Sequence, residues 1–187
     1  MQCKVEVFGR ENLPDADEKK VLYLANHASL MDIPILYGWV DWRPAFVAKR
    51  TLLWVPIVGQ WLWILGCVML SRKASKKELR KFYRIRDKLD EGLRFFLFPE
   101  GTRSRTGEVG QFRAVKKIME LDGLRVVPVH ISGSYEVVRA GSFALNPGQI
   151  TVYIGNSYLI SKDDSVENSF TAAQALAEIE KWMIDNK

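Results

Sequence analysis

A histidine and an aspartate five residues apart follow an apolar segment near the start of the chain. The run is Asn26-His27-Ala28-Ser29-Leu30-Met31-Asp32, directly after a predicted strand at 20–25. An imidazole exchanges protons near neutral pH, so His27 can be the base that a hydroxyl nucleophile needs. Asp32 can accept the proton of the other ring nitrogen, which fixes the tautomer and steadies the imidazolium. The alternative is a helix-capping histidine, with Asp32 merely favourable near the helix N-terminus.

A second polar run follows another predicted strand, at 94–98. Its sequence is Phe98-Pro99-Glu100-Gly101-Thr102-Arg103-Ser104. Gly101 permits close backbone approach, and the planar guanidinium of Arg103 suits a phosphate. A charged Glu100–Arg103 pair at the end of a buried strand is costly unless a ligand or partner uses it. The alternative is a surface loop with an ordinary ion pair.

Two basic residues, Lys49 and Arg72, flank an apolar segment between these runs. Lys49 closes a predicted strand at 44–49 and can meet an anionic headgroup, although a lysine at a strand end is usually solvated. Residues 51–71 carry no charge, as a transmembrane helix would require. We instead expect a core helix followed by a strand at 68–71, because proline and glycine interrupt the segment. Its tryptophans are candidates for core packing, for contact with a bilayer surface or for an acyl-chain tunnel.

The elements that must position these residues alternate along the chain. Strands are predicted at 3–8, 20–25, 44–49, 94–98, 125–131 and 150–155. Helices are predicted from near Ser29 and at 75–91, 111–121 and 171–185, the second and fourth opening with capping boxes. This alternation predicts an α/β fold in which residues 1–187 form a single layered domain. We expect a mixed, largely parallel central sheet flanked by helices.

Composition limits the class of protein further. The chain has 187 residues, of which 48% are hydrophobic, enough for one domain with a real core. Its net charge of +5 is uneven, because residues 72–88 hold nine basic and two acidic side chains. Such a basic helix favours an anionic partner, whether lipid, phosphate substrate or nucleic acid. A metal site is not expected, because the two histidines, His27 and His130, lie far apart and have no cysteine partners.

Taken together, these motifs resemble the glycerolipid acyltransferase family, in particular the lysophosphatidic acid acyltransferases. The resemblance covers about residues 4–132 and consists of four blocks in order. They are the run Asn26–Asp32, the block Lys49, Pro56, Gly59, Gly66 and Arg72, the run Phe98–Ser104, and the strand Val127-Pro128-Val129. Two departures stand out. We expect no N-terminal membrane-docking helices of the kind common in the family, because the sequence opens near its first predicted strand, and Val115 stands where the family often has glycine.

The resemblance implies roles for individual residues. His27 would be the general base and Asp32 its partner, while Lys49 and Arg103 would hold the acceptor's phosphate. Arg72 would be a weaker third phosphate ligand. The remaining substrate-binding candidates are Asn26, Glu100, Gly101 and Thr102, with Glu100 and Gly101 at the acyl site.

The resemblance also implies a reaction. An acyl group would pass from acyl-CoA or acyl carrier protein, a co-substrate, to the free hydroxyl of 1-acylglycerol-3-phosphate, giving phosphatidic acid without a cofactor. We expect direct transfer, a peripheral position on the cytoplasmic side of a membrane and no nucleic-acid partner. Two alternatives remain open: the same chemistry on another lysolipid, and a non-enzymatic protein that binds anionic lipid or nucleic acid through the basic helix.

Overall fold

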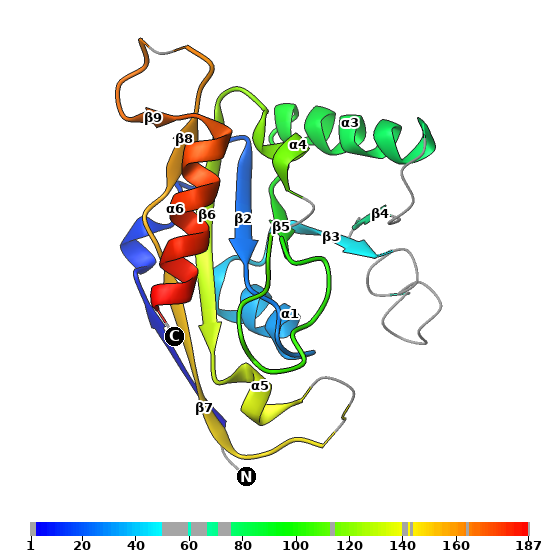
Figure 1. The fold of residues 1–187 in the computed structure, drawn as a ribbon, viewed down its shortest axis with the longest axis vertical. Helices are drawn as coiled ribbons and strands as arrows, with labels where there is room; N and C mark the ends of the chain where they lie inside the picture. The colour runs from blue at the N-terminus through cyan, green and yellow to red at the C-terminus, as the bar shows by residue number, and fades with distance from the viewer. Residues whose placement is uncertain are drawn as a thin grey trace.

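The computed structural model describes residues 3–49, 60, 67–70, 76–112, 115–139, 142, 144–163 and 165–186. The strands are β1 (Cys3–Phe8), β2 (Val21–Ala25), β3 (Ala45–Lys49), β4 (Val68–Leu70), β5 (Phe95–Leu97), β6 (Leu124–Ser132), β7 (Gly148–Ile154), β8 (Tyr158–Ile160) and β9 (Ser169–Phe170). The helical segments are η1 (Arg10–Asn12), α1 (Asp32–Ile35), η2 (Leu36–Val40), α3 (Lys76–Asp90), α4 (Lys116–Met119), α5 (Ser134–Val137) and α6 (Ala172–Asp185). Figure 1 shows their arrangement.

The strands form one mixed sheet in the order β1-β7-β6-β2-β5-β3-β4, with β8 paired to β6 and β9 to β8. The pairs of β2 with β5 and β6, and of β3 with β4 and β5, are parallel. The pairs of β6 with β7 and β8 are antiparallel. The predicted fold class, a mixed and largely parallel sheet flanked by helices, is therefore confirmed.

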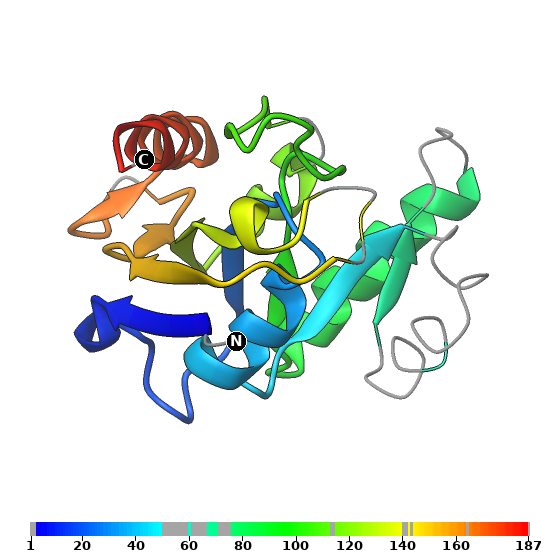
Figure 2. The ribbon, with the colours of Figure 1, turned by 90° about the horizontal axis from the view of Figure 1, so that it is seen from below.

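Apolar residues cover both faces of the sheet, because successive strand residues point to opposite sides. On one face Leu22 and Leu24 of β2 belong to a core with side chains of α3, α4 and α6. On the other face Val21 and Tyr23 pack with α1, η2 and the end of α5. Figure 2 accordingly shows α6 and α1 on opposite sides of the sheet. This double burial explains why β2 is an unbroken apolar run.

A buried ionic network holds the amino-terminal ends of β2 and β5. Asp41 accepts hydrogen bonds from the Tyr23 hydroxyl at 2.9 Å and from Arg94 Nη1 at 3.1 Å. Arg94 also donates to the carbonyls of Ala16 and Glu18, in the loop before β2. The charges of Asp41 and Arg94 are thus paired and hydrogen-bonded, as buried charges must be. The network fixes the strands whose opposite ends carry the site.

The boundaries predicted for two helices differ from those in the structure. The first helix begins at Asp32 rather than near Ser29, and it continues as the π-helical turn η2. Of the helix expected at 111–121, the described residues show only α4, Lys116–Met119, and residues 111 and 112 lie in a loop. The Thr171 capping box on α6 is present as predicted, whereas the one at Ser75 lies outside the described residues.

The apolar segment at 51–71 lies largely outside the described residues. Its described part includes β4, which confirms the strand expected there. Within the described part of the chain, no helix is both long and apolar enough to cross a bilayer. The core helix, the tryptophan contacts and the acyl tunnel remain predictions.

Candidate active site

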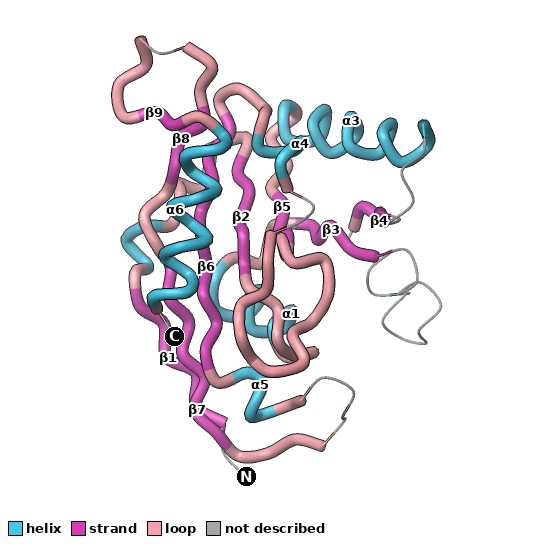
Figure 3. The backbone as a smooth tube through the Cα atoms, in the orientation of Figure 1, coloured by secondary structure: helices cyan, strands magenta, loops and turns pink. Residues whose placement is uncertain are grey.

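The two polar runs meet because they leave neighbouring parallel strands at the same edge of the sheet. Leu24 of β2 lies opposite Leu97 of β5, so His27 and Glu100 each follow three residues later. Figure 3 shows β2 and β5 side by side, with the long loop after β5 leaving from the same end as the segment that leads from β2 to α1. Hydrogen bonds confirm the contact: the backbone N–H of Ser104 donates to the carbonyl of His27 at 2.7 Å. Carboxyl ends of parallel strands are the usual place for a ligand site in such sheets.

His27 and Asp32 form a direct pair. The distance between His27 Nδ1 and Asp32 Oδ2 is 2.8 Å, and Asp32 is fully buried at the start of α1. The same Oδ2 atom accepts the backbone N–H groups of Ala28 and Ser29, also at 2.8 Å. An ionised carboxylate is the natural acceptor for three such donors, so Nδ1 carries the proton and Nε2 is left as the acceptor. The alternative of a simple helix-capping histidine does not account for this orientation.

The His27 ring is held by a second contact. It stacks on Phe98, with ring centroids 3.9 Å apart and an angle of 11° between the planes. The side chain is 16% exposed, so a substrate hydroxyl can reach it while most of its surface is packed. Packing and the Asp32 hydrogen bond together restrict the imidazole to one orientation, which general-base catalysis requires.

The carboxylate of Glu100 binds the backbone of His27. Its Oε1 accepts the backbone N–H of His27 at 3.1 Å, and the backbone N–H of Gly110 also binds the carboxylate. Burial raises the pKa of Glu100 to about 7, partly offset by these two hydrogen bonds, and nearby Asp32 raises it slightly further. Through the hydrogen bonds from the His27 and Gly110 N–H groups, Glu100 joins the histidine loop to the loop after β5. The geometry therefore favours a positioning role over direct contact with the acyl group.

The side chain of Asn26 forms two hydrogen bonds with the backbone of β6. Its Nδ2 donates to the carbonyl of Ile131 at 2.9 Å, and its Oδ1 accepts the Ile131 N–H at 2.7 Å. Only 3% of the residue is exposed. The side chain thus hydrogen-bonds to the backbone of β6 just before His27 and extends the pairing of β2 with β6. This arrangement favours a positioning role for Asn26 over the substrate contact expected from the sequence.

Arg103 has the features of an anion ligand. The residue is half-buried, and its Nη1 atom is buried without a hydrogen-bond partner among the described residues. A buried guanidinium donor is costly unless an acceptor satisfies it, and a phosphate would do so. The preceding Gly101, at φ +68°, closes a turn by donating its N–H to the carbonyl of Phe98 at 3.0 Å. Thr102 is exposed beside Arg103.

The other basic candidates are only partly placed. Val47 of β3 lies opposite Leu97, so the backbone of Lys49 reaches the same edge of the sheet as the loop of Arg103. Strand register alone thus supports Lys49 as a neighbour of the site. Arg72 lies outside the described residues.

Glu100→Gln is expected to change the pH dependence of stability. A carboxyl whose pKa is higher in the folded chain favours folding at low pH, and this contribution disappears as pH rises from about 4.5 to about 7. Relative to the variant, the natural chain should lose at most about 3 kcal/mol of unfolding free energy across that range. Urea unfolding at pH 5 and pH 8 measures the difference, and equal pH slopes for both proteins would show that Glu100 does not titrate in this way.

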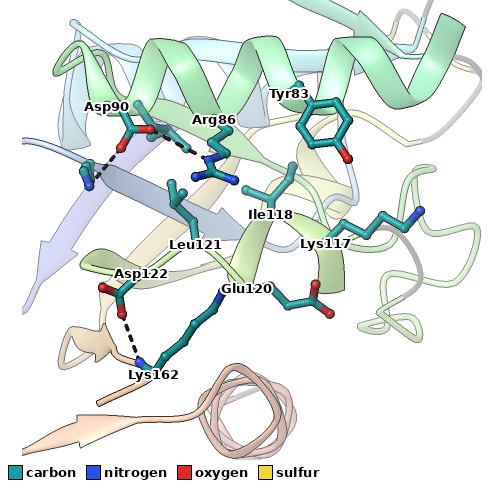
Figure 4. A pocket seen from close by; sticks show the side chains of 11 residues that line it. Tyr83, Arg86, Asp90, Lys117, Ile118, Glu120, Leu121, Asp122 and Lys162 are labelled. Atoms are coloured by element: carbon teal, nitrogen blue, oxygen red, sulfur yellow. Dashed lines mark hydrogen bonds and ion pairs between the residues drawn. The ribbon is translucent and has the colours of Figure 1, made fainter. Parts of the chain in front are cut away.

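A cavity of about 450 Å³ lies at the opposite edge of the sheet, near the amino-terminal ends of β2, β5 and β6 (Figure 4). Its wall includes Lys20 and Arg86, which pair with Asp90 at 2.8 Å and 3.9 Å, and Asp122, which accepts the N–H of Lys162. The cavity is thus separate from His27. Among the described residues, no three His, Cys, Asp or Glu side chains gather as metal ligands.

Two residues important to this geometry had no assigned role in the sequence analysis. Phe98 was visible in the second run, but only the structure shows its ring beneath His27. Gly110 lies in a loop, and its approach to Glu100 is so close that an added Cβ would lie 3.2 Å from Oε2. No local sequence signal marks either contact, because both join segments distant in the chain.

The site thus combines a His27–Asp32 pair at the carboxyl edge of parallel strands with an arginine, Arg103, on the neighbouring loop. The family model described as Acyltransferase matches residues 4–132. The chain therefore belongs to the acyltransferase family.

Similar proteins agree with this assignment. A 1-acyl-sn-glycerol-3-phosphate acyltransferase of Chlamydomonas reinhardtii is 36% identical over 154 residues, which are 81% of this chain and 46% of that protein. One from Pseudomonas aeruginosa is 35% identical over 155 residues, 81% of this chain and 58% of that protein. The crystal structure of the 1-acyl-sn-glycerophosphate (LPA) acyltransferase PlsC from Thermotoga maritima superposes with a TM-score of 0.79 at 31% identity, covering 98% of this chain and 70% of that one. The chain spans about half the length of several curated relatives it matches.

Proposed function

We propose that this chain transfers a fatty acyl group from a thioester to the free hydroxyl of 1-acylglycerol-3-phosphate, giving phosphatidic acid. The observation that carries the proposal is the 2.8 Å His27–Asp32 pair, held next to the loop of Arg103. A base with a fixed tautomer and a nearby anion ligand are what an acceptor with one hydroxyl and one phosphate requires. The relatives described above, which are 1-acylglycerol-3-phosphate acyltransferases, support the choice of acceptor.

The proposed chemistry begins at Nε2 of His27. This atom takes the proton of the acceptor hydroxyl as its oxygen attacks the thioester carbonyl carbon. Asp32 stabilises the imidazolium that forms but remains ionised. When the C–S bond breaks, the imidazolium returns the proton to the leaving thiolate. The acyl group passes directly to the acceptor, so no acyl-enzyme forms.

Arg103 and Lys49 are proposed to hold the acceptor's phosphate, with Arg72 as a further candidate. The buried Nη1 atom of Arg103, which has no hydrogen-bond partner among the described residues, supports this role. The strand register of β3, which brings the backbone of Lys49 to the same edge of the sheet, supports it for Lys49. Binding the phosphate at a fixed distance from His27 would orient the free hydroxyl toward Nε2. The oxyanion would be stabilised by a donor other than the Gly101 N–H, since that group is engaged in the turn.

The acyl donor is proposed to be acyl-CoA or acyl carrier protein.

We also propose that the enzyme works peripherally, at the cytoplasmic face of a membrane, where a lysolipid acceptor resides. The exposed Arg84 and Arg86 of α3 support attraction to anionic lipid, at about 1 kcal/mol for each charge near the surface. Flotation with anionic vesicles should carry the protein, and equal flotation with neutral vesicles would contradict this electrostatic attachment.

The test of the proposed reaction compares acceptors. Purified protein is given a long-chain acyl-CoA or acyl carrier protein, together with lysophosphatidic acid, monoacylglycerol or lysophosphatidylcholine. We expect phosphatidic acid as the main product, with at least about a tenfold preference in kcat/KM for the phosphomonoester over monoacylglycerol. Preference for another lysolipid would show that the acceptor is wrong. A folded protein that is inactive with both donors would contradict the enzymatic assignment.

A further inference from the structure

Tyr135, at the start of α5, contacts the loop that carries Arg103. The Tyr135 hydroxyl donates to the carbonyl of Arg105 at 2.8 Å, two residues beyond Arg103. The tyrosine ring also packs against Gly107, where an added Cβ would lie 3.2 Å from ring atom Cδ1. Gly107 has φ +87°, a left-handed conformation that suits glycine and brings its backbone close to the ring. Tyr135 thus touches the loop at two points.

The segment that carries Tyr135 is packed against the sheet and the histidine loop. Gly133, immediately before α5, packs so closely on β7 that a Cβ there would lie 2.2 Å from the carbonyl oxygen of Gln149. Beyond the helix, Val138 is buried, and its carbonyl accepts the Ser29 hydroxyl at 2.8 Å. Ser29 belongs to the loop that carries His27. The support of Tyr135 is therefore fixed to both the sheet and the histidine loop.

The loop from Gly101 to Gly110 has other attachments on either side of this contact. Ser104 donates its N–H to the carbonyl of His27, and Gly110 binds Glu100. Between them, the Arg105–Gly107 segment is held to the body of the protein through Tyr135. Arg103 lies next to this segment, so the direction of its guanidinium depends on how firmly the segment is held.

We propose that Tyr135 is a positioning residue that fixes the Arg103 loop and so sets the affinity for the acceptor's phosphate. The inference rests on the proposed role of Arg103. Tyr135 needs no contact with substrate, because it acts through the Arg105 carbonyl and the Gly107 backbone. Its loss should therefore weaken acceptor binding while the chemistry at His27, which has its own supports in Asp32 and Phe98, stays intact.

Tyr135→Phe is the sharpest variant, because it removes the hydroxyl and keeps the ring against Gly107. One lost hydrogen bond predicts a rise of about three- to tenfold in KM for lysophosphatidic acid. The kcat and the KM for the acyl donor should stay within about twofold, since the base is untouched. Tyr83→Phe is the matched control: this tyrosine is 53% exposed on α3, at the cavity on the opposite edge, and its variant should match the natural chain.

A second readout does not depend on activity. Arg103 and Arg105 are trypsin sites within the loop, and Arg105 is exposed. If Tyr135 holds this segment, brief digestion followed by mass spectrometry should show cleavage after Arg105 several-fold faster in Tyr135→Phe than in Tyr83→Phe. Cleavage elsewhere should keep its rate, and the two variants should unfold at similar temperatures.

The outcomes separate this inference from the proposed function. A raised acceptor KM together with faster loop cleavage supports it. Unchanged KM in an active Tyr135→Phe enzyme overturns it, even if cleavage accelerates, because the loop would then not govern acceptor binding. A natural chain that is inactive toward lysophosphatidic acid would instead refute the proposed function, and this inference would fall with it.

Discussion

His27→Gln is expected to lower kcat/KM for acyl transfer by about 10³-fold, because general-base catalysis contributes factors of this size. Glutamine is close in size to histidine and can keep a hydrogen bond to Asp32, but it cannot accept a proton. The fold should persist, since the ring is held at the edge of the site rather than in either core. Steady-state rates of phosphatidic acid formation, measured beside thermal unfolding, check the prediction.

Chemical rescue provides the control for this variant. His27→Ala leaves a space between Phe98 and Asp32 that is the size of an imidazole ring. Added imidazole should restore part of the lost rate in His27→Ala, because a free base can occupy that space, but not in His27→Gln, where the side chain fills it. A His27→Gln enzyme that keeps more than about a tenth of the natural rate would rule out general-base catalysis by His27.

Asp32→Asn is expected to lower kcat by about 10²- to 10⁴-fold, with little change in KM for either substrate. Asp32 Oδ2 accepts three N–H groups, whereas Oδ1 is buried without a partner among the described residues. An asparagine can therefore keep its oxygen at the Oδ2 position and place its amide at the other. The substitution removes the charge that stabilises the imidazolium while the loop is retained.

Asp122→Asn is the matched control for Asp32→Asn. Asp122 also accepts a backbone N–H, that of Lys162 at 2.9 Å, but it lies at the opposite edge of the sheet. Its variant should transfer acyl groups at the natural rate. If Asp32→Asn did the same, Asp32 would only close the turn before α1, and the buried charge would have no part in catalysis.

The parts of this fold that were predicted from the sequence are those with strong local patterns. β2 and β5 are continuous apolar runs that end in polar residues, so both the strands and the place of the candidate site at their ends were predictable. α6 was found through its Thr171 capping box and helical spacing. The His27–Asp32 pair was also predicted, since a spacing of five residues across a strand-to-helix turn allows the side chains to meet.

The features that were missed depend on contacts between distant segments. Nothing near Asn26 in the chain indicates that its amide joins Ile131, 105 residues away. The family resemblance implied a place for Glu100 at the acyl site, but nothing in the sequence indicated that its carboxylate accepts the His27 N–H. The two-residue strand β9 and the four-residue helix α5 are too short to produce a periodic pattern.

In the proposed mechanism, His27 activates an acceptor hydroxyl for direct attack on a thioester. Its most direct test is thiol release from a long-chain acyl-CoA, or from acyl carrier protein, with and without lysophosphatidic acid, for the natural chain and His27→Gln. We expect thiol release only with the acceptor present, in an amount equal to the phosphatidic acid formed, and we expect it to be nearly abolished in the variant. Release without acceptor, or the same rate in His27→Gln, would contradict it.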